Sequence, residues 1–110
     1  MITQSTFDFL SELKQNNTRE WYHANKDRYK EAFGNFEDLV AMLLHTIAGF
    51  DKSVVGTEPK DCLFRIYRDI RFSKDKTPFK TWFGAAMKQS GRKQVGSVYY
   101  IHVSPQQVYL

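Results

Sequence analysis

Apolar residues at helical spacing dominate the first half of the chain. Over residues 4–15 they recur at about every third position, which predicts a short amphipathic helix. Ser5 followed by Asp8 has the spacing of a capping box, with Asp in place of the usual Glu or Gln. The repeat consists of Phe7, Leu10 and Leu13.

A second helix is predicted over residues 18–33, after Asn16 and Asn17 end the first. Asn17 has a side chain that caps helices well, and Glu20 follows three residues later, where it can reach back to the cap amide. Four aromatic residues form a stripe along this helix, and their spacing is that of a buried face rather than of a base-stacking platform. The stripe consists of Trp21, Tyr22, Tyr29 and Phe33.

Gly34 and Asn35 predict a break or kink, after which a strongly apolar helix runs to about Ala48. Gly49 is a natural residue for its C-terminal end. Residues 51–61 contain glycine, proline and several charges, so we expect them to form a connection.

The second half of the chain reads as strands. Leu63–Tyr67 is predicted to be a strand in which Phe64 and Ile66 face one way while Leu63, Arg65 and Tyr67 face the other. Residues 79–88 fit either a helical face or a strand, and we favour a strand from about Trp82.

Residues 97–103 are rich in β-branched and aromatic residues and predict a strand. Residues 104–107 then turn the chain into a further strand that starts at Val108. The expected fold class is therefore α+β, with N-terminal helices packed on a mainly antiparallel sheet from the C-terminal half. We expect residues 1–110 to form one such domain.

The last predicted strand stops in mid-pattern at Leu110. We therefore expect a fragment of a longer domain, or a sheet completed by another chain as a homodimer or a swapped sheet.

Composition supports a packed globule, because 42% of residues are hydrophobic and 15% aromatic. No apolar run approaches the roughly 20 residues that a membrane helix needs, so no membrane partner is predicted. No signal peptide is visible at the N-terminus. Cys62 is the sole cysteine, which suits a reducing cytoplasm, and its apolar neighbours make it a small core residue.

Charge is unevenly distributed along the chain. Residues 60–93 carry ten Lys or Arg against three Asp, whereas the remainder has six Lys or Arg against nine Asp or Glu. The net charge of +4 thus comes from the middle of the chain. Such asymmetry indicates an anionic partner for this part, unless it is simply a solvated basic face.

The most basic stretch runs from residue 62 to residue 83. Its cations alternate with aromatic and branched residues, and only Asp69 and Asp75 offset them. Arginine forks bind phosphate oxygens with two hydrogen bonds, and lysine adds a point charge. Thr77-Pro78 has the pattern of a helix start, whose free amides would add donors for an anion. The anion-site candidates are Arg65, Arg68, Arg71, Ser73, Lys74, Lys76, Thr77 and Lys80.

Two alternatives to a binding module for a phosphate-bearing ligand or nucleic acid stay open. In the first, Asp69, Asp75 and Glu20 pair with the basic residues, and the stretch is a purely structural ion network. In the second, the chain is an enzyme acting on a small anionic, phosphorylated metabolite, with electrostatic stabilisation of a phosphoryl group as its mode.

Signatures of catalysis are sparse, and no catalytic residue is assigned. The three histidines, His23, His45 and His102, lack metal-ligand spacing, and no glycine-rich phosphate loop is present. No metal or cofactor is predicted.

Three segments together resemble a bacterial family catalogued as domain of unknown function 2461. They are the Asn-Asn-x-Arg-Glu-Trp-Tyr run at residues 16–22, the run from Arg65 to Lys80 with its Arg-Asp-x-Arg-Phe-Ser-Lys-Asp-Lys-Thr-Pro block, and Tyr-Tyr-Ile-His at residues 99–102. The resemblance implies a bacterial cytoplasmic protein with an α+β domain, of which this chain is the N-terminal half. It supplies no reaction.

Overall fold

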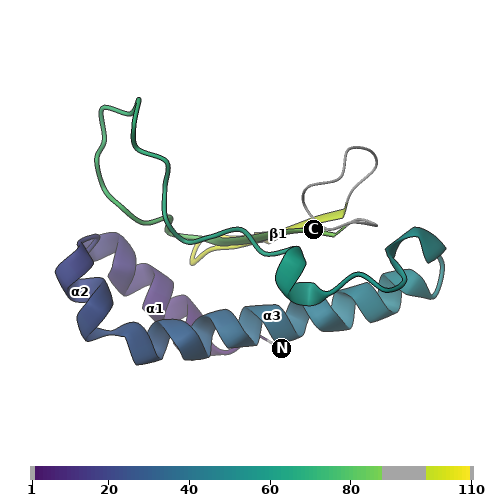
Figure 1. Cartoon of the computed structure of the whole chain (residues 1–110). Coiled ribbons are helices and arrows are strands. Elements are labelled where there is room, and N and C mark those ends of the chain that lie inside the picture. Colours follow the sequence, from purple (N-terminus) through teal and green to yellow (C-terminus); the bar gives the residue numbers. More distant parts are fainter. Residues whose placement is uncertain (1, 88–98, 110) are drawn as a thin grey trace.

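Helices and strands segregate along the chain into the α+β arrangement that the sequence predicts. A computed structural model describes residues 2–87 and 99–109. The helices form a layer beneath an antiparallel sheet (Figure 1). The elements are α1 (Gln4–Gln15), α2 (Arg19–Ala24), α3 (Lys26–Ala48), the 3₁₀ turns η1 (Lys52–Val54) and η2 (Pro59–Asp61), β1 (Phe83–Met87), β2 (Tyr99–Val103) and β3 (Val108–Tyr109).

Helix α1 has the predicted bounds, but the predicted capping box at its start is wrong. The N-cap residue is Thr3, and its hydroxyl lies 2.7 Å from that of Ser5, which is already inside the helix. Asp8 accepts a hydrogen bond from the Gln4 side chain instead of a cap amide. The buried side of α1 carries Phe9, Leu10 and Leu13, each with no exposed surface.

The cap of α2 is Thr18, not the predicted Asn17. The Thr18 hydroxyl accepts from the Trp21 amide at 3.2 Å, which satisfies one of the orphan donors at a helix start. Helix α2 is also short, because the chain leaves helical geometry at Asn25. There the Asn25 side-chain amide donates to the Trp21 carbonyl at 2.9 Å.

The predicted break at Gly34-Asn35 is wrong, since α3 runs through both residues without interruption. Glycine inside a helix costs about 1 kcal/mol relative to alanine. Burial of Ala32 and Phe36 on either side of Gly34 outweighs that cost, because these residues belong to one continuous core face. Gly49 is the C-cap residue, as predicted.

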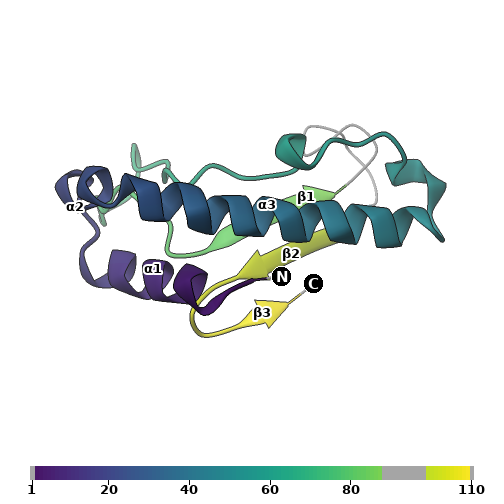
Figure 2. The ribbon, with the colours of Figure 1, turned by 90° about the horizontal axis from the view of Figure 1, so that it is seen from below.

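The sheet has the order β1-β2-β3, and both pairings are antiparallel. In the ambiguous stretch 79–88, residues Phe83–Met87 form a strand. The strand predicted over 97–103 is confirmed by β2 for residues 99–103, while residues 97 and 98 lie outside the described ranges. Seen from below, α3 lies across the face of this sheet (Figure 2). The inner sides of β1 and β2 contribute Phe83, Ala85, Met87, Ile101 and Val103 to the core.

The outer face of the sheet carries a row of rings. Trp82 stacks on His102 at 5.0 Å between centroids, and His102 stacks on Tyr109 at 4.8 Å. Gly84 lies beneath this row, where an added Cβ would come within 2.5 Å of the Trp82 ring and 2.8 Å of the Tyr100 hydroxyl. A glycine is therefore required here by the close approach of the rings.

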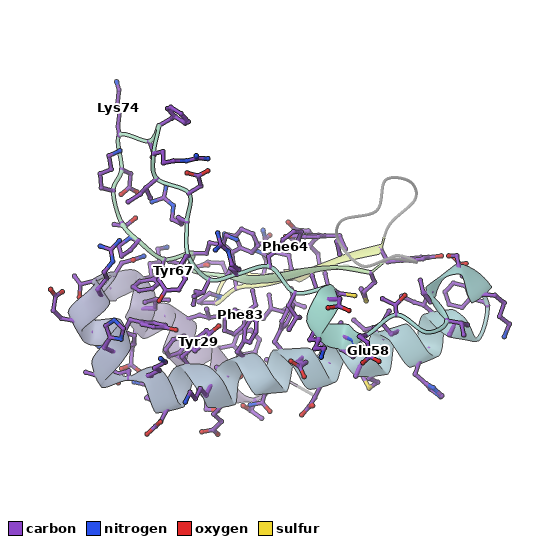
Figure 3. All side chains as sticks on the ribbon, in the orientation of Figure 1. Tyr29, Glu58, Phe64, Tyr67, Lys74 and Phe83 are labelled. Carbon is purple, nitrogen blue, oxygen red and sulfur yellow. The ribbon has the colours of Figure 1, made fainter. Side chains whose placement is uncertain are left out.

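The strand predicted over Leu63–Tyr67 is wrong, since this stretch runs beside β1 with isolated bridges only, and the predicted alternation of faces is wrong as well. Ile66 is buried, as is Leu63, whereas Phe64 is half-buried on the side away from the helices (Figure 3). The segment pairs with the chain around β1 only at Leu63↔Ala85 and Tyr67↔Phe79. Between the two pairs, residues 64–66 lie opposite residues 80–84, so one side has two residues more than the other. This bulge shifts the pairing register, and side chains of residues 63–67 no longer alternate strictly between the two faces.

No helix begins at Thr77-Pro78, contrary to the sequence prediction. The Thr77 amide donates to the Asp75 side chain at 2.9 Å, and the Lys80 amide donates to the Ile66 carbonyl at 2.7 Å. The chain stays extended because Phe79 is drawn into the core with 1% of its surface exposed.

In the part of the chain that the structure covers, no helix combines the length and the apolar character needed to cross a bilayer.

Candidate functional site

Residues 68–78 form a loop that rises away from the sheet, here called the projecting loop. Figure 1 shows it standing clear of both layers, and Figure 3 places Lys74 at its tip. Most of the predicted anion-site residues lie on it. Arg65 and Lys80 flank its two ends.

The root of the projecting loop is held by Asn17. Its side-chain Nδ2 donates to the Phe79 carbonyl at 2.9 Å, and its Oδ1 accepts from the Phe79 amide at 3.0 Å. The Phe79 ring stacks on Tyr22 with centroids 4.5 Å apart and contacts Tyr67 at 5.1 Å. The loop therefore starts from a rigid part of the core. The sequence predicted Asn17 as a helix cap, because the helix start lies next to it, whereas Phe79 lies 62 residues away and its proximity is set by the fold.

Arg68 points into the projecting loop and ties its two sides together. Its Nη1 donates to the Thr77 carbonyl at 2.9 Å and to the Thr77 hydroxyl at 2.7 Å. The same nitrogen lies 3.5 Å from Oδ2 of Asp75, and Nη2 lies 3.5 Å from the Ser73 hydroxyl. These donors are engaged inside the loop, so Arg68 serves to shape it.

Arg71 and Asp69 form a forked ion pair on the surface. Nε of Arg71 lies 3.0 Å from Oδ1 of Asp69, and Nη2 lies 2.9 Å from Oδ2. The hydrogen bonds from the Arg71 side chain and amide lower the pKa of Asp69 to about 2. Three-quarters of the Arg71 side chain is nevertheless exposed, which leaves it accessible to a partner.

The Asp75 carboxylate interacts with Thr77 more closely than with Arg68. Its carboxylate mainly receives the Thr77 amide, and this backbone hydrogen bond is the largest cause of its lowered pKa, while the charge of Arg68 is a smaller one. Its distance of 3.5 Å from Arg68 is long for a charge-assisted hydrogen bond.

The lysines of this region contact carbonyl oxygens. Nζ of Lys76 donates to the Ile70 carbonyl at 2.6 Å, and Nζ of Lys80 donates to the Arg65 carbonyl at 2.7 Å. Lys80 also lies over the Trp82 ring, 5.2 Å from its centroid. A carbonyl dipole orients an ammonium group without cancelling its charge, so both lysines keep their net positive charge.

Phe72 is the most exposed large hydrophobic residue in the described chain, with 94% of its surface accessible. The Arg71 guanidinium carbon lies 5.6 Å from its ring centroid. An exposed phenyl ring on a loop that stands clear of the core contributes nothing to folding through burial.

The structure thus divides the predicted candidates into two groups. Arg68, Ser73 and Thr77 face one another inside the projecting loop. Three other cations of the loop are exposed, although Arg71 pairs with Asp69 and Lys76 donates to the Ile70 carbonyl. Glu20 takes part in none of the ion pairs that involve described residues. The exposed cations of the projecting loop are Arg71, Lys74 and Lys76, while Arg65 and Lys80 lie outside the loop.

A cleft of about 380 Å³ lies at the root of the loop. It contains the Asp69 and Asp75 carboxylates beside Arg68, which makes it a poor receptor for an anion. No histidine lines it, and within the described ranges no group of His, Cys, Asp or Glu is arranged to hold a metal ion. Its lining residues are Asn17, Arg68, Asp69, Asp75, Thr77, Phe79, Lys80, Thr81 and Trp82.

Comparison with known proteins identifies the family. A family model described as "Conserved hypothetical protein (DUF2461)" matches residues 5–110. The chain belongs to the DUF2461 family. No curated protein and no solved structure matches it. In this DUF2461 chain the Arg-Asp-x-Arg-Phe-Ser-Lys-Asp-Lys-Thr-Pro block, on which the resemblance chiefly rests, is the whole of the projecting loop.

Proposed function

We propose that the projecting loop binds single-stranded nucleic acid. Arg71, Lys74 and Lys76 contact backbone phosphates, and Phe72 stacks on a base. The observation that carries this proposal is the exposure of Phe72, at 94%, beside exposed cations. Stacking on an aromatic ring contributes about 1–3 kcal/mol per base, and a base is accessible for stacking mainly in a single strand.

The placement of the cations favours a polyanion over a small phosphate ligand. A small phosphate is held best by several donors that converge on one point. Here the Arg68 side chain is held inside the loop by Thr77, and the exposed cations are Arg71, Lys74 and Lys76, at separate positions along the loop. Charges spread in this way suit a chain of phosphates, each of which needs one contact.

The same region supplies the electrostatic attraction that such a partner requires. Ten Lys or Arg against three Asp between residues 60 and 93 give it a strong positive balance, and the sequence pI is about 9.2. A bacterial cytoplasm, where single-stranded nucleic acid is abundant, is part of the proposal. A single buried cysteine is compatible with that reducing compartment.

An enzyme acting on a small phosphorylated metabolite has less support. Such a substrate would occupy the cleft at the root of the loop, and there the donors of Arg68 are taken while two carboxylates repel an anion. The purely structural alternative accounts well for Arg68 and Asp75. It gives no reason for an exposed Phe72.

The test is a fluorescence-anisotropy titration of labelled oligothymidylate, of about 12 nucleotides to match the usual site size of single-strand binding modules. We expect binding by the full chain and about tenfold weaker binding by Phe72→Ala, which removes the stack. A blunt duplex of the same length should bind more weakly than the single strand. Equal affinities of the wild type and Phe72→Ala for the oligonucleotide would reject the proposal.

A further inference from the structure

Residues 62–68 flank the sheet beside β1, joined to the neighbouring stretch of the chain by isolated bridges, and here are called the edge segment. Along it, the Phe64 amide donates to the Gly84 carbonyl at 3.0 Å and the Arg68 amide donates to the Pro78 carbonyl at 2.9 Å. In Figure 2 the segment runs along the side of β1 opposite to β2. The hydrogen bonds inside the sheet thus come from alternate residues of the edge segment.

Leu63 and Tyr67 occupy the other positions. Each is the non-hydrogen-bonded member of its antiparallel pair, with Ala85 and Phe79 respectively. In such pairs the N–H and C=O groups point away from the neighbouring strand. Neither residue has a backbone hydrogen bond with any residue in the described ranges. The backbone N–H and C=O groups of Leu63 and Tyr67 therefore point outward, four residues apart, where a further strand could bind them.

A groove of about 360 Å³ follows the edge segment and separates it from α3. Its walls are mainly apolar, with Tyr29 and Phe33 from α3 facing Leu63 and Ile66. Figure 3 shows Tyr29 rising from α3 towards the sheet. A strand added to this edge would direct every second side chain into such a groove.

The positive charge of the groove indicates that its occupant is acidic. Lys60 and Arg65 are exposed and line it, whereas Glu37 is the one carboxylate among its lining residues. Neither cation forms an ion pair with a described residue. The groove therefore favours acidic side chains at its rim and apolar side chains on its floor.

We infer that the edge segment and this groove bind an extended acidic peptide segment of a partner protein, which joins the sheet as an additional strand. Backbone hydrogen bonds to Leu63 and Tyr67 supply the pairing. Apolar side chains at alternate positions of the peptide enter the groove between Tyr29 and Ile66, and carboxylates contact Lys60 and Arg65. This site is separate from the exposed cations of the projecting loop, so it does not depend on nucleic-acid binding.

The experiment titrates ¹⁵N-labelled full-length chain with an acetylated and amidated peptide in which Glu and Val alternate over about seven residues, long enough to span the edge segment. We expect the amide signals of Leu63 and Tyr67 to move downfield and their hydrogen exchange to slow. The same peptide with Lys in place of Glu should bind at least about tenfold more weakly. N-methylation of the peptide amides that face the edge should abolish binding.

Two variants locate the site. Arg65→Glu should weaken peptide binding by about tenfold, whereas the matched control Lys52→Glu, on an exposed 3₁₀ turn, should leave it unchanged. Absence of binding, equal binding of the N-methylated peptide, or shifts confined to the projecting loop or to the Val108–Tyr109 edge would each overturn the inference.

Discussion

The side chain of Asn17 pairs with the backbone of Phe79 as a neighbouring strand would. It donates to the Phe79 carbonyl at 2.9 Å and accepts from the Phe79 amide at 3.0 Å. The two residues are 62 positions apart, so this pairing joins the connection between α1 and α2 to the root of the projecting loop. Such an anchor would favour the proposed binding, because each side chain ordered before binding reduces the entropy lost on binding.

Substitution Asn17→Ala should destabilise the chain by about 1–3 kcal/mol, because both polar groups of the partly buried Phe79 backbone lose their partner. Asn17→Asp should be destabilising as well, since a carboxylate oxygen would replace the donor that faces the Phe79 carbonyl. Thermal unfolding measures both effects. For a domain of this size, each kcal/mol corresponds to a fall of about 4–8 °C in Tm.

Asn16→Ala is the matched control for Asn17. The Asn16 side chain donates to the Glu12 carbonyl at the exposed end of α1, where water can replace it, so a loss of about 0.5 kcal/mol is expected. Equal effects of the Asn16 and Asn17 variants would contradict the anchoring role.

The substitution Arg68→Lys tests whether Arg68 holds the shape of the loop or contacts a partner directly. Lysine keeps the charge but cannot reproduce the fork that reaches the carbonyl and hydroxyl of Thr77. We expect faster hydrogen exchange across residues 68–78 and weaker oligonucleotide binding. In Lys74→Ala, binding should weaken without any change in exchange. Unchanged exchange in Arg68→Lys would show that Arg68 does not shape the loop.

The Arg71–Asp69 pair should be visible in an acid titration followed by carboxyl carbon NMR. The hydrogen bonds from Arg71 hold the pKa of Asp69 at about 2, below the ordinary 3.8. Because the folded pKa is the lower one, the contribution of the pair is complete above pH 3.8 and is lost as the pH falls through about 2. Arg71→Ala should return the midpoint towards 3.8. A wild-type midpoint near 3.8 would mean that the pair does not form in solution.

Alkaline pH should weaken the fold through Tyr29. Burial raises the pKa of its hydroxyl from 10.0 to about 12. The unfolded chain therefore loses this proton first, so stability is complete below pH 10 and falls as the pH rises towards 12. Urea unfolding at several pH values should show a shallower decline in Tyr29→Phe than in the wild type. Identical pH profiles would count against burial of this hydroxyl.

Much of the fold follows from local sequence patterns, because the spacing of apolar residues marks the buried face of each helix and each strand. The bounds of α1 and the existence of β1 and β2 were predictable for this reason. Where local and tertiary preferences disagree, the sequence prediction failed. Gly34 indicated a break, yet its neighbours Ala32 and Phe36 belong to a core that spans the whole of α3.

The sequence singles out the residues of the candidate site, which stays a prediction, but it does not show how their side chains are oriented. The block of alternating cations and aromatic residues coincides with the projecting loop, whereas which cation lies inside the loop depends on partners that the fold brings close. Thr77 engages Arg68 only because the loop folds back on itself, and Thr77-Pro78 starts no helix because Phe79 is held in the core by Asn17. Neither relationship leaves a periodic signal in the sequence.

The salt dependence of oligothymidylate binding tests the central claim most directly. Each phosphate contact of a single strand adds about 0.7 to the slope of log K against log salt. The combined variant Arg71→Ala, Lys74→Ala, Lys76→Ala should therefore bind more weakly and lose roughly 2 from that slope. The matched double variant Lys26→Ala, Lys30→Ala, on the exposed side of α3, should keep both affinity and slope. An unchanged slope and affinity in the combined loop variant would contradict nucleic-acid binding by the projecting loop.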